Sequence, residues 1–104
     1  MLQMYMNVPN VPEEAVKDYA RHLLRLCGVA RIVEPGHWWF EHQMGRFQAA
    51  YRELLKSMVK QRSDRGEVLR AAKRYALQFH ADGLASADVY RDAMGILARG
   101  LQWS

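Results

Sequence analysis

The sequence predicts an all-α protein, a small four-helix domain with one long central helix and an extended N-terminal arm. The first indication is a run of apolar residues between positions 37 and 62, spaced at alternating steps of four and three as on a helix with one apolar face. These residues are Phe40, Met44, Phe47, Tyr51, Leu54 and Met58. The second indication is that four segments show helical patterns and none has a convincing sheet partner. Short connections between the last three helices favour antiparallel neighbours.

Residues 1–11 are expected to form the arm. Its apolar side chains alternate with polar ones, a period of two that is typical of extended backbone; they are Leu2, Met4, Met6 and Val8. An unpaired extended segment needs a partner protein, a second copy or its own helices to lie against. The alternative is a frayed tail, which is common at chain termini. The residues alone leave both interpretations open.

The first helix is expected over residues 12–27. Pro12 has the fixed φ that suits a first helical position, and Glu13 and Glu14 follow where carboxylates interact favourably with the helix dipole. Gly28 predicts the end of this helix. In the connection over residues 29–35, three aliphatic side chains are expected to tuck against the core: Val29, Ile32 and Val33.

The long helix is expected over residues 37–62, a length of ~39 Å at a rise of ~1.5 Å per residue. A compact domain of this chain length is only about 33 Å across. The excess length indicates that a second chain covers part of the helix, so the sequence predicts a homodimer. The expected dimer interface consists of Phe40, Met44, Phe47, Tyr51 and Leu55.

Two further helices are expected over residues 64–80 and 86–99. Asp64 with Glu67 resembles a capping box, and Ser86 is a favourable N-cap residue. Gly100 predicts the end of the last helix. In the remaining tail, Trp103 is expected to fold back onto the body of the protein.

Composition and length indicate a single domain over residues 1–104, with a formal net charge of +4. No apolar run reaches the ~18 residues that a membrane helix needs, and the N-terminus lacks the features of a signal peptide. Cys27 is the lone cysteine, so no internal disulfide can form. These features predict a cytoplasmic protein in which Cys27 is a buried structural residue.

No motif points to catalysis or to a cofactor. His37 and Glu41 share a helix face, but His42 lies about 140° around the helix from His37, at ~100° per residue, so the three do not form a known metal motif. A glycine-rich phosphate loop and a nucleophile motif are both lacking. The sequence therefore predicts a protein that is not an enzyme and that binds no cofactor and no metal.

An aromatic cluster at the start of the long helix is the sharpest functional signal. Consecutive helical residues lie ~100° apart, so Trp38, Trp39 and Phe40 cannot all enter one core. At least one indole must be covered by something else, and tryptophan is enriched among binding hot spots. The alternative is that the arm or the connection over residues 29–35 covers the indoles. The expected partner-binding residues are Met4, Met6, Trp38, Trp39, Arg46 and Val59.

A basic segment supports an alternative function, binding of nucleic acid. Seven cationic residues stand near the junction of the second and third helices: Lys56, Lys60, Arg62, Arg65, Arg70, Lys73 and Arg74. Such a patch could follow a phosphate backbone. No helix-turn-helix signature accompanies it, and a net charge of +4 is modest for a DNA-binding protein. The more usual role of such charges is to form a solvated basic face.

The chain as a whole resembles the small QslA-type quorum-sensing anti-activators of pseudomonads. The likeness rests on its length, the four-helix pattern, the arm Met-Leu-Gln-Met-Tyr-Met-Asn-Val-Pro and the Pro-Gly-His-Trp-Trp-Phe entry into the long helix. The resemblance implies a dimer that binds the ligand-binding domain of a LuxR-type transcription activator (LasR). Such a complex would prevent the activator from dimerising and engaging DNA. The resemblance contains no motif that transfers contact residues.

Overall fold

A computed structural model describes residues 10–103, and within this range the chain forms four α-helices and no strand. The helices are α2 (Glu13–Ala30), α3 (Trp38–Gln61), α4 (Arg65–Ala81) and α5 (Ala87–Arg99). The all-helical prediction is confirmed for this range. The expected arm, with Met4 and Met6, lies outside the described residues apart from its last two positions.

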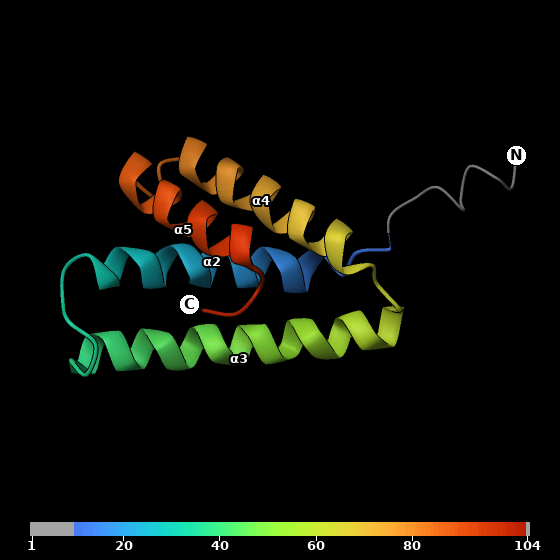
Figure 1. Ribbon diagram of the computed structural model, residues 1–104, viewed down its shortest axis with the longest axis horizontal. Helices are drawn as coiled ribbons and strands as arrows, with labels where there is room; N and C mark the ends of the chain where they lie inside the picture. Colours follow the sequence, from blue (N-terminus) through green and yellow to red (C-terminus); the bar gives the residue numbers. More distant parts are fainter. Residues whose placement is uncertain (1–9, 104) are drawn as a thin grey trace, which may run out of the picture.

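The helices stack in three layers with α2 in the middle. In Figure 1, α3 runs along one side of α2, and α4 and α5 lie together on the other side. The central helix is therefore α2, and the prediction that the long helix is central was wrong. The reason is the width of the apolar surface: the buried residues of α2 span an arc of about 220° at ~100° per residue, enough for neighbours on two sides. Those of α3 span only about 80°.

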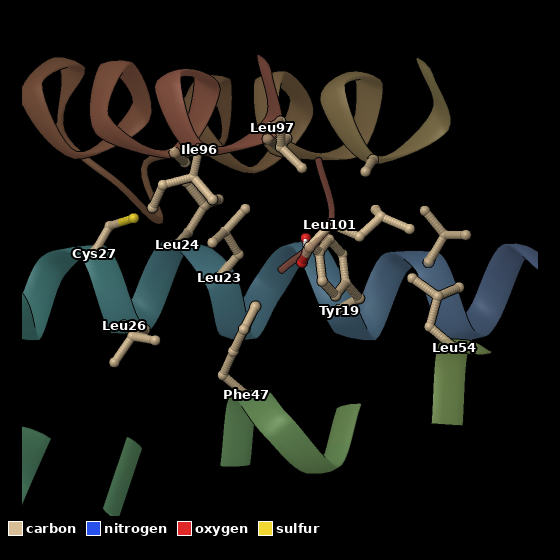
Figure 2. Packing of buried hydrophobic residues seen from close by; sticks show 14 of the residues in the cluster. Tyr19, Leu23, Leu24, Leu26, Cys27, Phe47, Leu54, Ile96, Leu97 and Leu101 are labelled. Carbon is tan, nitrogen blue, oxygen red and sulfur yellow. Dashed lines mark hydrogen bonds between the residues drawn. The ribbon is translucent and has the colours of Figure 1, made fainter. Parts of the chain in front are cut away.

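The core is built around the two apolar sides of α2. Figure 2 shows Leu24 and Cys27 directed towards α5, where Ile96 lies, and Leu26 on the side that faces α3. Burying a leucine side chain of this kind stabilises the fold by roughly 1.5–3 kcal/mol.

The tail after α5 closes the core between α2 and α3. The buried Tyr19 hydroxyl donates a hydrogen bond to the carbonyl oxygen of Leu101 at 2.5 Å, and burial raises the pKa of this phenol. Trp103 places its ring edge-on to Phe40 and Phe47, each with a centroid separation of 6.3 Å. The expected return of Trp103 onto the body is confirmed.

The helix ends follow local chemistry. The Asp64 carboxylate accepts from the backbone N–H of Glu67, and the Ser86 hydroxyl accepts from that of Val89, as the capping patterns predicted. The expected end of the first helix at Gly28 was wrong, because α2 continues to Ala30. An interior glycine costs about 1 kcal/mol relative to alanine. Continuing the helix buries Val29, which offsets that cost.

The buried stripe of α3 differs from the expected seam. Gln43 and Ala50 are buried, whereas Met44 and Tyr51 are half-buried. The amide of Gln43 donates to His22 Nδ1 at 3.2 Å, so α2 supplies a polar partner for a residue that hydrophobic spacing alone would have placed outside. The centre of the buried stripe is rotated by about 30° around the helix axis from the centre of the apolar pattern, at ~100° per residue.

This burial changes the expected dimer interface. Phe40 and Phe47 are only 5% and 1% exposed, because α2 and Trp103 cover them within one chain. They therefore leave almost no surface for a second copy, and their assignment to a dimer interface is corrected. Met44, Tyr51 and Leu55 are half-buried along one flank of α3, and their part in a dimer stays a prediction.

Candidate functional site

The start of α3 is held rigidly by its cap. His37 precedes the helix, and its Nδ1 accepts a hydrogen bond from the backbone N–H of Trp39 at 3.1 Å. The backbone N–H of Gly36 donates to the Glu41 carboxylate at 3.2 Å, which ties the turn before the helix to its first turn. Gly36 has a φ of 98°, a conformation that favours glycine. The backbone that carries the side chains of this first helical turn is therefore hydrogen-bonded both at the cap and at the turn before it.

Two neighbouring indoles project from this turn into solvent. Trp38 is 74% exposed and Trp39 is 38% exposed, whereas Phe40 is buried. The two indole rings lie with centroids 6.5 Å apart and planes inclined by 27°, and the His37 ring lies 5.6 Å from that of Trp38. The prediction that the three aromatic residues cannot share one core is confirmed.

A hollow of about 510 Å³ lies beside Trp39. Its lining comes from α2, the connection after it, α3 and the start of α5: Arg25, Gly28, Val29, Arg31, Ile32, Trp39, Gln43 and Val89. Ile32 is 68% exposed, so the expectation that it tucks against the core was wrong. Val29 is buried and Val33 packs against the core, as expected. We call Ile32, Trp38 and Trp39 the indole surface.

An ion pair anchors the segment that carries Ile32. The Arg31 guanidinium contacts the carboxylate of Asp92 at 2.7 Å and that of Asp88 at 3.8 Å, both on α5. These groups raise the pKa of Arg31 through a hydrogen bond and through charge. The connection is thereby attached to α5, and Ile32 remains next to the hollow. Sequence spacing could not have revealed this site, because its residues come from four separate segments.

The other expected partner-binding residues lie apart from the indole surface. Arg46 lines a different hollow, of about 220 Å³, together with Asp18, His22 and Glu53. Val59 is 79% exposed, but it is 21 positions after Trp38, or ~32 Å along the helix axis. The structure therefore brings only Trp38 and Trp39 together among the expected residues that it describes.

The basic residues divide into two groups. Lys56, Lys60 and Arg62 lie at the end of α3, where Lys56 approaches the Glu53 carboxylate at 3.7 Å. The other group is on α4, on the far side of α2 in Figure 1: Arg65, Arg70, Lys73 and Arg74. The two groups adjoin at the α3–α4 turn, where Arg62 and Arg65 are three positions apart, and they extend from there along different helices. The binding of nucleic acid by these residues stays a prediction.

The described residues contain little reactive chemistry. No group of three or more His, Cys, Asp or Glu side chains within residues 10–103 could hold a metal ion. Burial, with a smaller effect from the Asp92 carboxylate, raises the pKa of the Cys27 thiol to about 12, so the reactive thiolate is suppressed. None of the helices in this range is long and apolar enough to cross a membrane.

Comparison of the chain with protein-family models, with curated proteins and with solved structures finds no match.

Proposed function

We propose that this protein is a non-enzymatic regulator that binds another protein through the indole surface and thereby blocks that partner's own association. The observation that carries the proposal is the pair of exposed indoles on a rigid helix start, beside an apolar hollow. From the resemblance in the N-terminal arm and the Trp-Trp-Phe entry, the partner we propose is the ligand-binding domain of a LuxR-type transcription activator. The activity is then quorum-sensing anti-activation.

The energetics support a binding role for these side chains. A tryptophan buries roughly 150–250 Å² when it is covered. Trp38 leaves most of that area in water, although solvent exposure of a large aromatic side chain contributes nothing to folding. Its neighbours on the indole surface, Trp39 and Ile32, are also exposed, so the unburied area is contiguous. Contiguous apolar surface is the usual mark of a protein-binding site.

The mechanism is occlusion. The activator forms its dimer through an apolar surface patch. While another protein covers that patch, a second copy of the activator cannot bind there. A chain that seats two indoles in that patch holds the activator as a single copy. A single copy lacks the symmetric pair of DNA-contacting elements that a palindromic site needs.

We further propose that the protein acts as a homodimer. α3 has 24 residues and α2 has 18, so α3 extends beyond its main neighbour by ~9 Å at ~1.5 Å per residue. A hollow of about 270 Å³ along its half-buried flank is lined in part by Met44, Tyr51 and Trp103. Light scattering at micromolar concentration that returns the mass of a single chain would contradict the dimer.

The test is a binding measurement with a purified LuxR-type ligand-binding domain. Replacing both Trp38 and Trp39 by alanine is expected to weaken binding by about 30-fold to 1,000-fold, which corresponds to a combined loss of roughly 2–4 kcal/mol for the pair. The matched control is Leu84→Ala, which truncates an apolar side chain of similar exposure to Trp39, 44% against 38%, in the α4–α5 connection. The control should bind as the unmodified protein does.

Circular dichroism establishes that each variant keeps its helices. Equal affinity of the double variant and the unmodified protein would remove the indole surface from the site. Absence of any binding by the unmodified protein would reject the LuxR-type partner.

A further inference from the structure

A second surface, between α4 and α5, combines cations with an apolar floor. A hollow of about 390 Å³ lies between α4 and α5, and we call it the basic groove. Its lining residues are Arg70, Lys73, Arg74, Leu77, Tyr90 and Met94. Leu77 belongs to α4 and is 52% exposed, although α5 packs beside α4. The basic groove lies in the α4–α5 layer, whereas Trp38 and Trp39 stand on α3 on the other side of α2 (Figure 1). The two sites come nearest at the start of α5, where Val89 lines the hollow beside Trp39 and Tyr90 lines the groove.

The α4 side of the groove carries an excess of positive charge. Arg70 is paired with Glu67 one turn earlier. Among residues 10–103, no carboxylate forms an ion pair with Lys73 or Arg74. On α5, Asp88 is engaged by Arg31 and Arg91, and Asp92 by Arg31, so neither is directed at the groove. The groove therefore presents unneutralised cations beside the exposed Leu77 and the half-buried Tyr90 and Met94.

The spacing of these residues matches one class of ligand. Arg70, Lys73, Arg74 and Leu77 recur at steps of three and four, so they form one ridge along α4. Tyr90 and Met94 form the parallel ridge along α5. A groove between two helices accepts an amphipathic helix, whose apolar residues at the same spacing fit between the ridges. Charge complementarity requires acidic residues on the flank next to α4.

We infer that the basic groove is a docking site for an acidic amphipathic helix of a partner protein. Leu77, Tyr90 and Met94 contact the apolar face of that helix, and Lys73 and Arg74 pair with its carboxylates. This site goes beyond the proposed anti-activator function and does not depend on it. The groove shares no lining residue with the hollow beside Trp39.

Two other ligands fit the groove less well. A phosphate backbone would satisfy the cations but would leave Leu77 and Met94 without an apolar contact. A bilayer surface is flat on this scale, so it cannot fill a hollow between two helices. Both alternatives are included in the test.

The experiment uses the full chain and a defined probe, a fluorescent peptide of about 18 residues, ~27 Å as a helix, with leucines at helical spacing flanked by glutamates. We expect saturable binding with a Kd on the order of 10 µM. Leu77→Glu should weaken binding by at least about tenfold, because it places a carboxylate where the peptide's own acidic and apolar groups dock. Arg74→Glu should have an effect of at least the same size, because Arg74 is one of the two cations that pair with the peptide's carboxylates.

The matched control is Val59→Glu, which introduces the same charge at a 79% exposed aliphatic residue of α3. This variant should bind the peptide as tightly as the unmodified protein. A second control is the same peptide with every glutamate replaced by lysine, which should not bind. Circular dichroism and urea unfolding show that each variant is folded. All substituted side chains are exposed, so stability changes within about 0.5 kcal/mol are expected.

Nuclear magnetic resonance locates the binding site. Peptide addition should shift the methyl signals of Leu77 and Met94 and leave the indole N–H signals of Trp38 and Trp39 unchanged. No saturable peptide binding, or shifts confined to the indoles, would overturn the inference. It would also be overturned if anionic vesicles or duplex DNA bound more tightly than the peptide and lost binding on the same substitutions. A failure here leaves LuxR-type binding through the indole surface intact, so the two proposals are separable.

Discussion

The two longest helices, α2 and α3, differ in what each leaves available for function. α2 contacts α3 on one side and α4 and α5 on the other, and half of its 18 residues are buried. α3 has 24 residues, but only six of them are buried, all on one narrow stripe. Both helices are amphipathic, so the presence of an apolar face does not by itself explain why α2 has more buried residues than α3. The number of neighbours explains it: the helix with two neighbours forms the core, and the helix with one neighbour is free to present Trp38.

The largest expected effect tests the claim that α2 is central. Leu23→Ala, at a fully buried position of α2, should lower the free energy of unfolding by about 2–5 kcal/mol, because a cavity remains where the side chain was. Leu55→Ala, at a half-buried position of α3, should lower it by only about 1 kcal/mol. Urea unfolding followed by circular dichroism measures both. Equal losses would mean that α3 is covered in solution as fully as α2, which would favour a dimer through this flank.

An intermediate effect concerns the polar contact between the two helices. Burial lowers the pKa of His22 below its usual value of 6.5, despite the opposing Asp18 carboxylate, whose oxygen lies 3.6 Å from Nε2. The unfolded chain therefore takes up a proton at a higher pH than the folded chain does. Stability is fully present above about pH 6.5 and falls as the pH decreases towards the lowered pKa of the folded state.

His22→Gln should remove this part of the pH dependence. The measurement is the free energy of unfolding on either side of pH 6.5. The matched control is His42→Gln, at an exposed position on α3, which should retain the pH dependence of the unmodified protein. If the free energy of unfolding depends on pH in the His22 variant as it does in the control, burial at the α2–α3 contact does not disfavour protonation of the His22 imidazole.

The smallest expected effect concerns the free face of α3. Trp38→Ala should change the free energy of unfolding by no more than about 0.5 kcal/mol, because the indole is 74% exposed. Phe40→Ala, in the buried stripe two positions later, should lower the free energy of unfolding by about 3–5 kcal/mol. Thermal unfolding monitored by circular dichroism gives both values. A loss above about 1 kcal/mol for Trp38→Ala would mean that the indole is covered in solution, and the indole surface would lose its basis.

The sequence was sufficient to predict the helices, because local chemistry determines them. The spacing around Phe47 identified α3, and Asp64 and Ser86 marked the starts of α4 and α5. Helical geometry alone separated the exposed Trp38 from the buried Phe40. These inferences need only the phase of a helix and the residues that cap it.

The arrangement of the helices could not be read in the same way. Hydrophobic spacing indicates which side of a helix is buried, but not how many neighbours bury it, so the central position was assigned to α3. Gln43 was missed because its burial depends on His22, 21 positions away. Ile32 looked like a core residue, yet Arg31 binds α5 and leaves it in solvent. The hollow beside Trp39 combines four segments, and no single stretch of sequence contains it.

The hydrogen bond from Tyr19 to Leu101 has a consequence for the order of assembly, since it joins positions 82 apart. Bringing such distant parts of a chain together lowers the chain's conformational entropy. This loss opposes folding until the contact has formed and stabilises the folded state. A helical hairpin of α2 and α3 alone would leave Phe47 without Trp103 and Tyr19 without its acceptor. The segment after α5 therefore supplies contacts that complete the packing of Phe47 and Tyr19 in the hairpin that presents the indoles.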